Sequence, residues 1–270
     1  MAATTPNALP LALTLGEPAG IGPDVTLSVW LTRERHGLPP FYILADPNGM
    51  ARRARLMGVD VPIVPVSPGE AIEVFSRALP VVPLENAADA EPGEPDRAAA
   101  RGVIEAIARA VGDVRAGVAE AVVTNPINKR ALYEAGFQHP GHTEFLGVLS
   151  AAWQGSPAHP VMMLAGPELR AVPVTIHIPL SAVPAALTTD RIIETGRIVD
   201  RDMRRRFGFE TPRIAVAGLN PHAGEGGAMG GEDGAIIRPA IETLRAEGID
   251  AFGPLPPDTM FHPAARRRYD

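Results

Sequence analysis

Short apolar runs alternate with longer amphipathic stretches along most of the chain. In the first half, apolar runs predict strands over residues 9–15, 41–45, 61–66 and 119–124. Apolar residues at helical spacing and helix-start signals predict helices over residues 24–35, 47–57 and 96–116. Residues 84–96 are polar, contain prolines and show no periodicity, so they predict a surface loop.

The second half continues this alternation. Apolar runs predict strands over residues 161–165, 169–177 and 213–219. The dipeptide Gly166-Pro167 predicts a hairpin-like connection between the first two of these strands. Helices are predicted over residues 189–207 and 235–247, and the glycine-rich residues 220–234 predict a loop.

An alternation of strands and helices is typical of α/β proteins with a largely parallel sheet. The chain has 270 residues, which is long enough for two domains of common size. We expect a first α/β domain over residues 1–130 and a second α/β domain over residues 131–270, although the composition shows no linker between them.

The composition narrows the classes of function. The chain is 46% hydrophobic with a net charge of −6, which predicts a folded protein and argues against nucleic acid as its partner. No apolar run approaches the ~20 residues of a membrane helix. Residues 1–9 lack the features of a signal peptide, so we expect a cytoplasmic protein. The absence of cysteine excludes disulfides, thiolate catalysis and thiolate metal sites.

Two segments that follow predicted strands carry groups suited to ligands. Residues 16–23 (GEPAGIGP) could bring backbone N–H groups close to an anion, or could simply form a tight turn. Residues 124–129 (TNPINK) lie where α/β sheets place ligand-binding groups. Lys129 is the only lysine among 25 Lys and Arg residues, which favours a specific role for its ammonium. The alternative is a solvated lysine after an Asn-Pro turn.

Residues 141–145 (GHTEF) resemble the start of a helix. We expect His142 or Thr143 to cap this helix, and its free backbone N–H groups to face an anion. The alternative is a cap with no ligand, which is the commoner role of so short a motif.

Two histidines stand at the ends of predicted strands. His177 and His222 each lie next to or near a proline, and two imidazoles at one edge of a sheet would suit a divalent metal ion. The alternative is a pair of surface or hydrogen-bonded histidines. Asp258 is a carboxylate in a proline-rich segment, where it could also serve as a helix cap or a turn residue.

In this order, these segments resemble the motifs of the 4-hydroxythreonine-4-phosphate dehydrogenase family of vitamin B6 biosynthesis. The resembling residues are 16–24 (GEPAGIGPD), 124–129 (TNPINK), 141–145 (GHTEF), 161–164 (VMML), 177–180 (HIPL), 218–227 (GLNPHAGEGG) and 253–261 (GPLPPDTMF). The resemblance implies a two-domain α/β fold like that of isocitrate and isopropylmalate dehydrogenases. It also implies a homodimer with its active site at the subunit interface.

The resemblance further implies an oxidoreductase that uses NAD or NADP and one divalent ion (Zn, Mg, Mn or Co). It would oxidise 4-phosphooxy-L-threonine to 2-amino-3-oxo-4-phosphooxybutanoate, which decarboxylates to 3-amino-2-oxopropyl phosphate. His177 and His222 match two of three metal-binding histidines, and His142 and Thr143 match a substrate-binding pair. Asp258 matches a catalytic acidic residue near the metal, and a catalytic role for Lys129 is our hypothesis. No cofactor-binding residue is assigned.

The family's third metal histidine lies in a Tyr-His-Asp-Gln segment, and this sequence ends at Tyr269-Asp270. We therefore expect the C-terminal part of the family fold, which would complete the first domain, to lie beyond residue 270. Three other functions remain open at this point. They are a dehydrogenase of D-erythronate or D-threonate 4-phosphate, a metal-dependent acyl or phosphoryl transferase, and an inactive binding protein.

Overall fold

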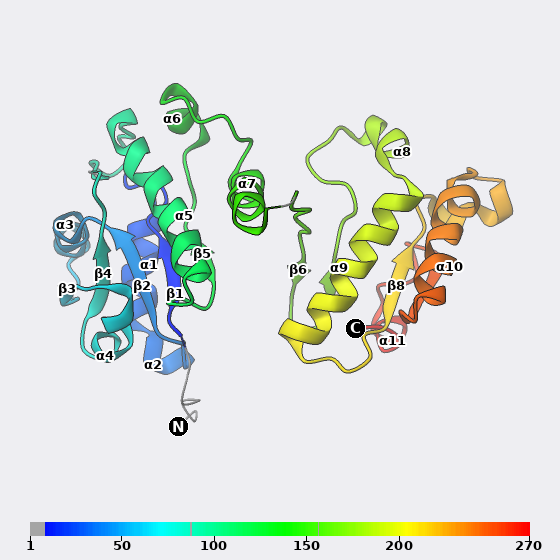
Figure 1. Ribbon diagram of the computed structural model, residues 1–270, viewed down its shortest axis with the longest axis horizontal. Helices are drawn as coiled ribbons and strands as arrows, with labels where there is room; N and C mark the ends of the chain where they lie inside the picture. The colour runs from blue at the N-terminus through cyan, green and yellow to red at the C-terminus, as the bar shows by residue number, and fades with distance from the viewer. Residues whose placement is uncertain (1–8, 87, 156) are drawn as a thin grey trace. The chain divides into compact units, whose positions relative to one another are not determined.

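The computed structural model of the protein describes residues 9–86, 88–155 and 157–270 (Figure 1). The first eight residues, which belong to the segment without signal-peptide features, lie outside the described residues. The chain forms two compact units, Met1–Pro160 (unit 1) and Val161–Asp270 (unit 2). Within the described part of the chain, no helix combines the length and the apolar character needed to cross a membrane.

Unit 1 contains a five-stranded parallel sheet. Its strands are β1 (Leu11–Thr14), β2 (Phe41–Ala45), β3 (Ile63–Pro65), β4 (Leu79–Pro83) and β5 (Val122–Thr124), in the spatial order β3-β4-β2-β1-β5. All pairs are parallel, and Thr14 of β1 lies opposite both Leu44 and Thr124. The predicted α/β class with a parallel sheet is therefore confirmed in this unit.

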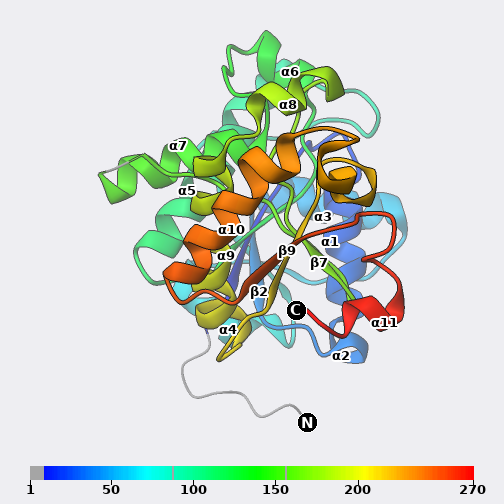
Figure 2. The ribbon, with the colours of Figure 1, turned by 90° about the vertical axis from the view of Figure 1, so that its right-hand side faces the viewer.

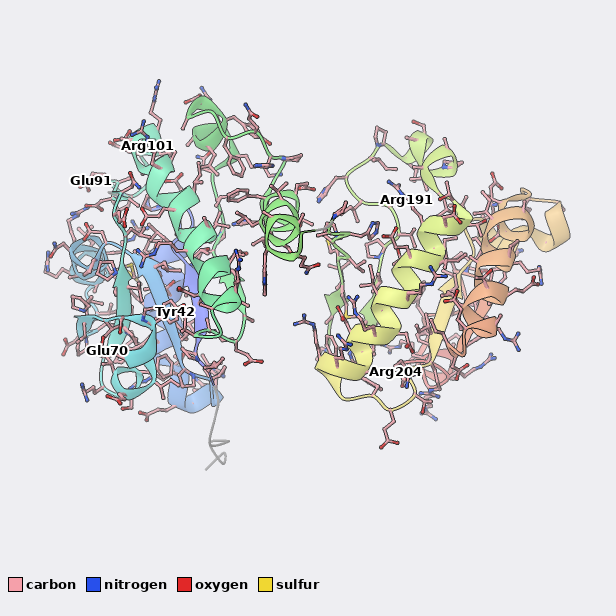
Figure 3. All side chains as sticks on the ribbon, viewed as in Figure 1. Tyr42, Glu70, Glu91, Arg101, Arg191 and Arg204 are labelled. Carbon is pink, nitrogen blue, oxygen red and sulfur yellow. The ribbon has the colours of Figure 1, made fainter. Side chains whose placement is uncertain are left out.

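Helices cover both faces of this sheet. They are α1 (Gly22–Leu31), α2 (Arg33–His36), α3 (Pro47–Met57), α4 (Ala71–Phe75), α5 (Ala100–Arg115), α6 (Lys129–Glu134) and α7 (His142–Gln154). Short 3-10 turns, η1 (Pro68–Glu70) and η2 (Arg97–Ala99), precede α4 and α5. One apolar core joins α1 and α3 to Leu13 and Ile43, and a second joins α5 to Ala12 and Tyr42. Tyr42, which is labelled in Figure 3, donates its hydroxyl hydrogen to Asp113 of α5 at 2.6 Å.

A further apolar cluster attaches α6 and α7 to unit 1. It contains Val103 and Ile107 of α5, Leu132 of α6, and Phe137 and Phe145 at or near α7. Because these side chains are buried against α5, the division between the two units lies at Pro160–Val161, and not near residue 130 as the sequence suggested.

Unit 2 is built around two long helices and a short parallel sheet (Figure 2). Its elements are β6 (Leu164–Ala165), β7 (Arg170–Ala171), η3 (Leu180–Ala182), α8 (Val183–Ala186), α9 (Thr189–Phe207), β8 (Ile214–Ala217), η4 (Pro221–Gly227), η5 (Asp233–Ile237), α10 (Arg238–Ala246), β9 (Ala251–Leu255) and α11 (Pro263–Arg266). Strands β8 and β9 are parallel, and β6 and β7 form the expected antiparallel hairpin. Ile192, Ile241 and Leu244 form the core between α9 and α10.

The sequence patterns missed some elements of both units. The strand expected over residues 169–177 is limited to Arg170–Ala171, and α4, β4 and β9 were not predicted. In β9, Gly253 and Pro254 interrupt the apolar run. A Cβ atom on Gly253 would lie 2.4 Å from the Val216 carbonyl oxygen, so this strand requires a glycine for its close approach to β8.

We predict that Thr188→Ala destabilises unit 2. The Thr188 hydroxyl accepts a hydrogen bond from the Arg191 N–H at 3.2 Å and so caps α9. Loss of such a cap typically lowers the free energy of unfolding by about 0.5–2 kcal/mol. Urea denaturation followed by circular dichroism measures this loss. Thr188→Ser, which keeps the hydroxyl, should retain most of the stability, and equal losses in the two variants would contradict the capping role.

Candidate active site

The two glycine- and asparagine-containing segments of unit 1 meet at the carboxyl ends of β1 and β5. Asn125 is 5% exposed, and its side-chain amide donates to the Thr14 carbonyl and to the Thr26 hydroxyl, both at 3.0 Å. The Glu17 N–H donates to the Pro126 carbonyl at 2.8 Å. Two of the predicted functional segments are therefore held together by buried hydrogen bonds.

Gly16 allows this close approach. Its φ of +72° is in the left-handed region, and a Cβ atom would lie 2.5 Å from the Pro126 carbonyl oxygen. The following loop is fixed by Arg53, whose Nε donates to both carboxylate oxygens of Asp24 at 3.1 Å. Arg53 also donates to the Gly20 carbonyl. The segment over residues 16–23 therefore forms a turn that hydrogen bonds hold in place.

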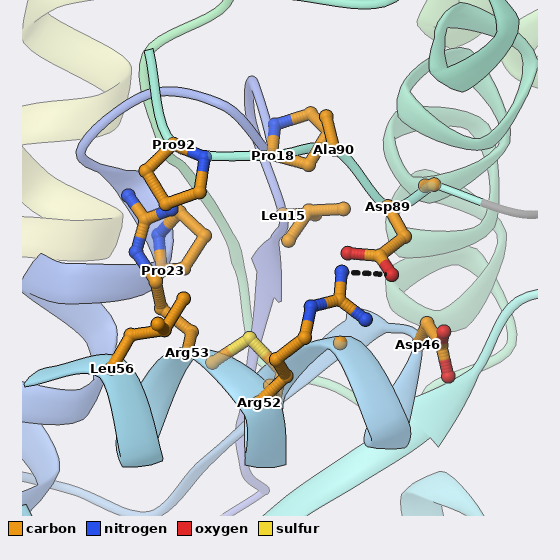
Figure 4. Close-up of a pocket in the computed structure, with 13 residues that line it drawn as sticks. Leu15, Pro18, Pro23, Asp46, Arg52, Arg53, Leu56, Asp89, Ala90 and Pro92 are labelled. Atoms are coloured by element: carbon orange, nitrogen blue, oxygen red, sulfur yellow. Dashed lines mark ion pairs between the residues drawn. The ribbon is translucent and has the colours of Figure 1, made fainter. Parts of the chain in front are cut away.

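One cavity borders the segment over residues 16–23, and another lies in unit 2. The first, beside Pro18, Arg53 and the Arg52–Asp89 ion pair, has a volume of about 20 Å³ (Figure 4), which is enough for about one water molecule. The second lies in unit 2 between α9 and β8, has a volume of about 340 Å³ and a mainly apolar lining. Neither cavity is lined by a histidine, so the candidate chemistry must be located from the side chains themselves.

Lys129 lies near the first turn of α7. It is the first residue of α6, where the Asn128 side chain accepts from the Ala131 N–H at 3.3 Å and caps the helix. The Lys129 Nζ lies 3.6 Å from the position that a Cβ atom on Gly141 would occupy. Gly141 is the N-cap residue of α7, so the expected cap by His142 or Thr143 is wrong.

The first turn of α7 presents unpaired donors. The backbone N–H groups of His142, Thr143 and Glu144 have no carbonyl within the helix that can accept from them. In the part of the chain that the structure describes, the buried Nε2 of His142 has no hydrogen-bond partner. Burial lowers the pKa of the His142 imidazole, and the Lys129 ammonium lowers it further. A neutral imidazole, a cation and free N–H groups are thus close together, which suits an anionic ligand.

In unit 2, His222 lies between two carboxylates. Its Nδ1 is 2.6 Å from Glu225 Oε1, and its Nε2 is 3.5 Å from Asp258 Oδ2. The hydrogen bond with Glu225, and then the charge of Asp258, raise the pKa of His222. His222 and Asp258 are each about half exposed, so a small ion could reach them. The structure therefore brings two predicted site residues together.

His177 is exposed at the end of the segment after β7. Among residues 9–86, 88–155 and 157–270, no group of three His, Asp or Glu side chains is arranged to hold a metal ion. His177 and His222 nevertheless share an uncommon backbone conformation. In that same part of the chain, the non-glycine residues with positive φ are His177, His222, Ala223 and Glu225. Such residues are costly to hold and cluster at functional sites.

Sequence reasoning missed Asp233. This residue is 3% exposed, and its carboxylate accepts from the Leu219 N–H at 2.9 Å and from the Asn220 side-chain amide at 2.9 Å. It therefore holds the beginning of the loop that carries His222. No local pattern singles it out, because it follows Glu232 and its hydrogen bonds reach residues 13 and 14 positions earlier.

Comparison with known proteins assigns the chain to one group of enzymes. The family profile described as "Pyridoxal phosphate biosynthetic protein PdxA" matches residues 38–270. Proteins named 4-hydroxythreonine-4-phosphate dehydrogenase from Bradyrhizobium diazoefficiens and Methylorubrum populi are 55% and 53% identical, each over 97% of this chain and over 78% and 75% of their own lengths. The crystal structure of the Klebsiella pneumoniae enzyme of that name has a TM-score of 0.83 at 32% identity, covering 97% of this chain and 80% of that one.

We predict that Lys129→Met raises the pKa of His142 toward the ordinary value of a histidine. The loss of a nearby ammonium removes one of the two effects that disfavour the imidazolium. Titration of the histidine ring resonances by NMR at low salt measures the change, because salt screens an exposed charge.

Arg130→Met provides the matched control. Arg130 is the next residue of α6, and its side chain is 89% exposed and paired with Glu134. This variant should leave the pKa of His142 unchanged. An equal pKa in Lys129→Met and in the unmodified protein would show that the ammonium does not act on His142.

Proposed function

The chain belongs to the PdxA family of pyridoxal phosphate biosynthetic proteins, and we propose that it is an NAD(P)-dependent, divalent-metal-dependent 4-hydroxythreonine-4-phosphate dehydrogenase. The observation that carries this proposal is 55% identity to a relative of that name over 97% of the chain. The reaction would oxidise 4-phosphooxy-L-threonine to 2-amino-3-oxo-4-phosphooxybutanoate, which then loses CO2 to give 3-amino-2-oxopropyl phosphate. The resemblance found in the motifs is thereby confirmed at the level of the family.

The first turn of α7 is the proposed seat for an anionic group of the substrate. The N–H groups of His142 and Thr143 point along the positive end of the helix dipole, which favours phosphate or carboxylate. The Lys129 ammonium adds a full positive charge near the same turn. His142 is neutral near pH 7, so its buried Nε2 can make one directional hydrogen bond to the substrate.

His177 and His222 are the residues that we propose for the divalent ion, and Asp258 is the acidic residue beside His222. Imidazole nitrogen and carboxylate oxygen are suitable donors for zinc, magnesium, manganese or cobalt. The fit is partial, because in the described ranges only the pair of His222 and Asp258 is in place. When bound, such an ion would act as a Lewis acid toward the substrate hydroxyl. Given this partial fit, no reaction step is assigned through the ion.

Asp258 is the proposed acceptor of the hydroxyl proton. Alcohol oxidation removes a hydride from carbon, which NAD(P)+ accepts, and a proton from oxygen. The exposed Asp258 Oδ2, 3.5 Å from His222 Nε2, is a base that can take this proton. A homodimer with its active site at the subunit interface, and a location in the cytoplasm, complete the proposal from the family resemblance.

We predict that the protein reduces NAD(P)+ with 4-phosphooxy-L-threonine and that His222→Ala abolishes most of this activity. Removal of a proposed ligand should lower kcat/KM by about 100-fold or more, because a Lewis acid held there would supply several kcal/mol of charge stabilisation. NAD(P)H formation at 340 nm measures the rate, and EDTA should have a similar effect.

The exposed histidine at the end of α2 supplies the control variant, His36→Ala, which should keep full activity. D-erythronate 4-phosphate and D-threonate 4-phosphate are assayed in parallel. Faster turnover of either compound would replace the proposed substrate, and no NAD(P)H with any of the three would contradict a dehydrogenase.

A further inference from the structure

The loop that carries His222 has a backbone that its sequence alone would not adopt. His222, Ala223 and Glu225 have φ values of 54°, 52° and 43°. Side chains with a Cβ rarely occupy this left-handed region, and never in a series unless the surroundings impose it. Gly224, Gly226 and Gly227 can adopt positive φ without strain, but they do not explain the positive φ of the non-glycine residues. Something outside the loop must therefore hold it.

The Asp233 carboxylate supplies that restraint. Its Oδ1 accepts from the Leu219 N–H at 2.9 Å, and its Oδ2 accepts from the Asn220 N–H at 3.3 Å and from the Asn220 side-chain amide at 2.9 Å. These three bonds pin the two residues that come directly before Pro221 and His222. An ionised acceptor makes stronger hydrogen bonds than a neutral one.

The same carboxylate fits against both sides of the loop. A Cβ atom on Gly218 would lie 2.5 Å from Asp233 Oδ1, and a Cβ atom on Gly224 would lie 3.1 Å from Asp233 Oδ2. Gly218 precedes His222 and Gly224 follows it. The loop therefore closes around the carboxylate, and the two glycines are needed because this acid occupies their side-chain space.

Asp233 stands on a rigid support. It begins the π-helical turn Asp233–Ile237, which continues into α10. Ile237 and Ile241 of this segment are 2% and 3% exposed and belong to the core of unit 2. A shift of the loop relative to Asp233 would thus require a shift of the core or a break in the three hydrogen bonds.

We propose that Asp233 is a positioning residue for His222: through Leu219 and Asn220 it sets the left-handed turn that holds the imidazole near Asp258. Asp233 is 3% exposed, and the role we propose for it acts through the loop. That the positioned imidazole serves a divalent cation rests on the proposed function, whereas the positioning itself does not.

The test compares Asp233→Asn with Glu232→Gln in the full chain. Asp233→Asn keeps the shape of the side chain but turns one acceptor into a donor, so it must lose a bond to the loop. Glu232→Gln is the matched control, because Glu232 also accepts from the Asn220 side-chain amide, at 3.0 Å, yet bonds to no backbone N–H of the loop. Both changes remove one negative charge from the same turn.

Two measurements report on the positioning without any need for catalysis. Hydrogen exchange of the Leu219 and Asn220 amides should become faster in Asp233→Asn, and the His222 ring resonances should shift toward those of a mobile histidine. Glu232→Gln should change neither. Ile193→Val, which weakens the core of unit 2 at α9, controls for a general loss of stability and should not move the His222 resonances.

Titration with Zn²⁺ alone then tests the consequence for the ion. Loss of a residue that orients a metal ligand typically weakens affinity by about 10- to 100-fold, and we expect Asp233→Asn to fall in this range relative to Glu232→Gln. Unchanged His222 resonances and amide exchange in Asp233→Asn would overturn the positioning role. Changed resonances with unchanged Zn²⁺ affinity would keep the positioning role and count against the proposed metal site.

If Asp233→Asn does not fold, Gly218→Ala provides the same test from the other side. Its new methyl group displaces the carboxylate from the loop, so the His222 resonances should shift in the same direction. A folded Gly218→Ala variant with native His222 resonances would overturn the proposal.

Discussion

The chemical motifs of this protein lie at the ends of strands. In each unit, one buried polar side chain makes hydrogen bonds to the backbone there, and the loop depends on these bonds. In unit 1, Asn125 donates to the Thr14 carbonyl and the Thr26 hydroxyl and so joins the ends of β1 and β5. In unit 2, Asp233 accepts from two backbone N–H groups beyond β8. Burying an unpaired polar group costs free energy, so these hydrogen bonds leave each loop few alternative backbone conformations.

This constraint explains why the glycines of the motifs lie where they do. Gly16 and Gly22 pack against Asn125, and Gly218 and Gly224 pack against Asp233. In each unit, the polar side chain and the glycines form one arrangement, since a larger residue at the glycine would occupy the space of the polar group. A loop held in this way can keep a non-glycine residue in an unfavourable backbone conformation, as at His222.

The hydrophobic pattern predicted best those helices and strands in which each residue is plainly either buried or exposed. Helices α3 and α9 have the predicted bounds, because their apolar residues face one core and their ends carry clear caps. Strand β2 has the predicted bounds because all of its residues are buried. Strand β9 was not predicted, because Gly253 and Pro254 interrupt its apolar run. Gly253 is there for the close contact with β8. At the site, composition and motif order indicated His142, His222 and Asp258. Asp233 could not be recognised, because its value lies in contacts with residues about 14 positions earlier, which no local pattern records.

The two candidate histidines have opposite electrostatic surroundings, and this separates their roles. Burial and the Lys129 ammonium disfavour the imidazolium of His142, so this ring is suited to hydrogen bonding in its neutral form. Glu225 and Asp258 favour the imidazolium of His222, because two carboxylates attract whatever positive charge lies between them. The surroundings thus divide one residue type into a ring whose charged form is disfavoured in unit 1 and a ring whose charged form is favoured in unit 2.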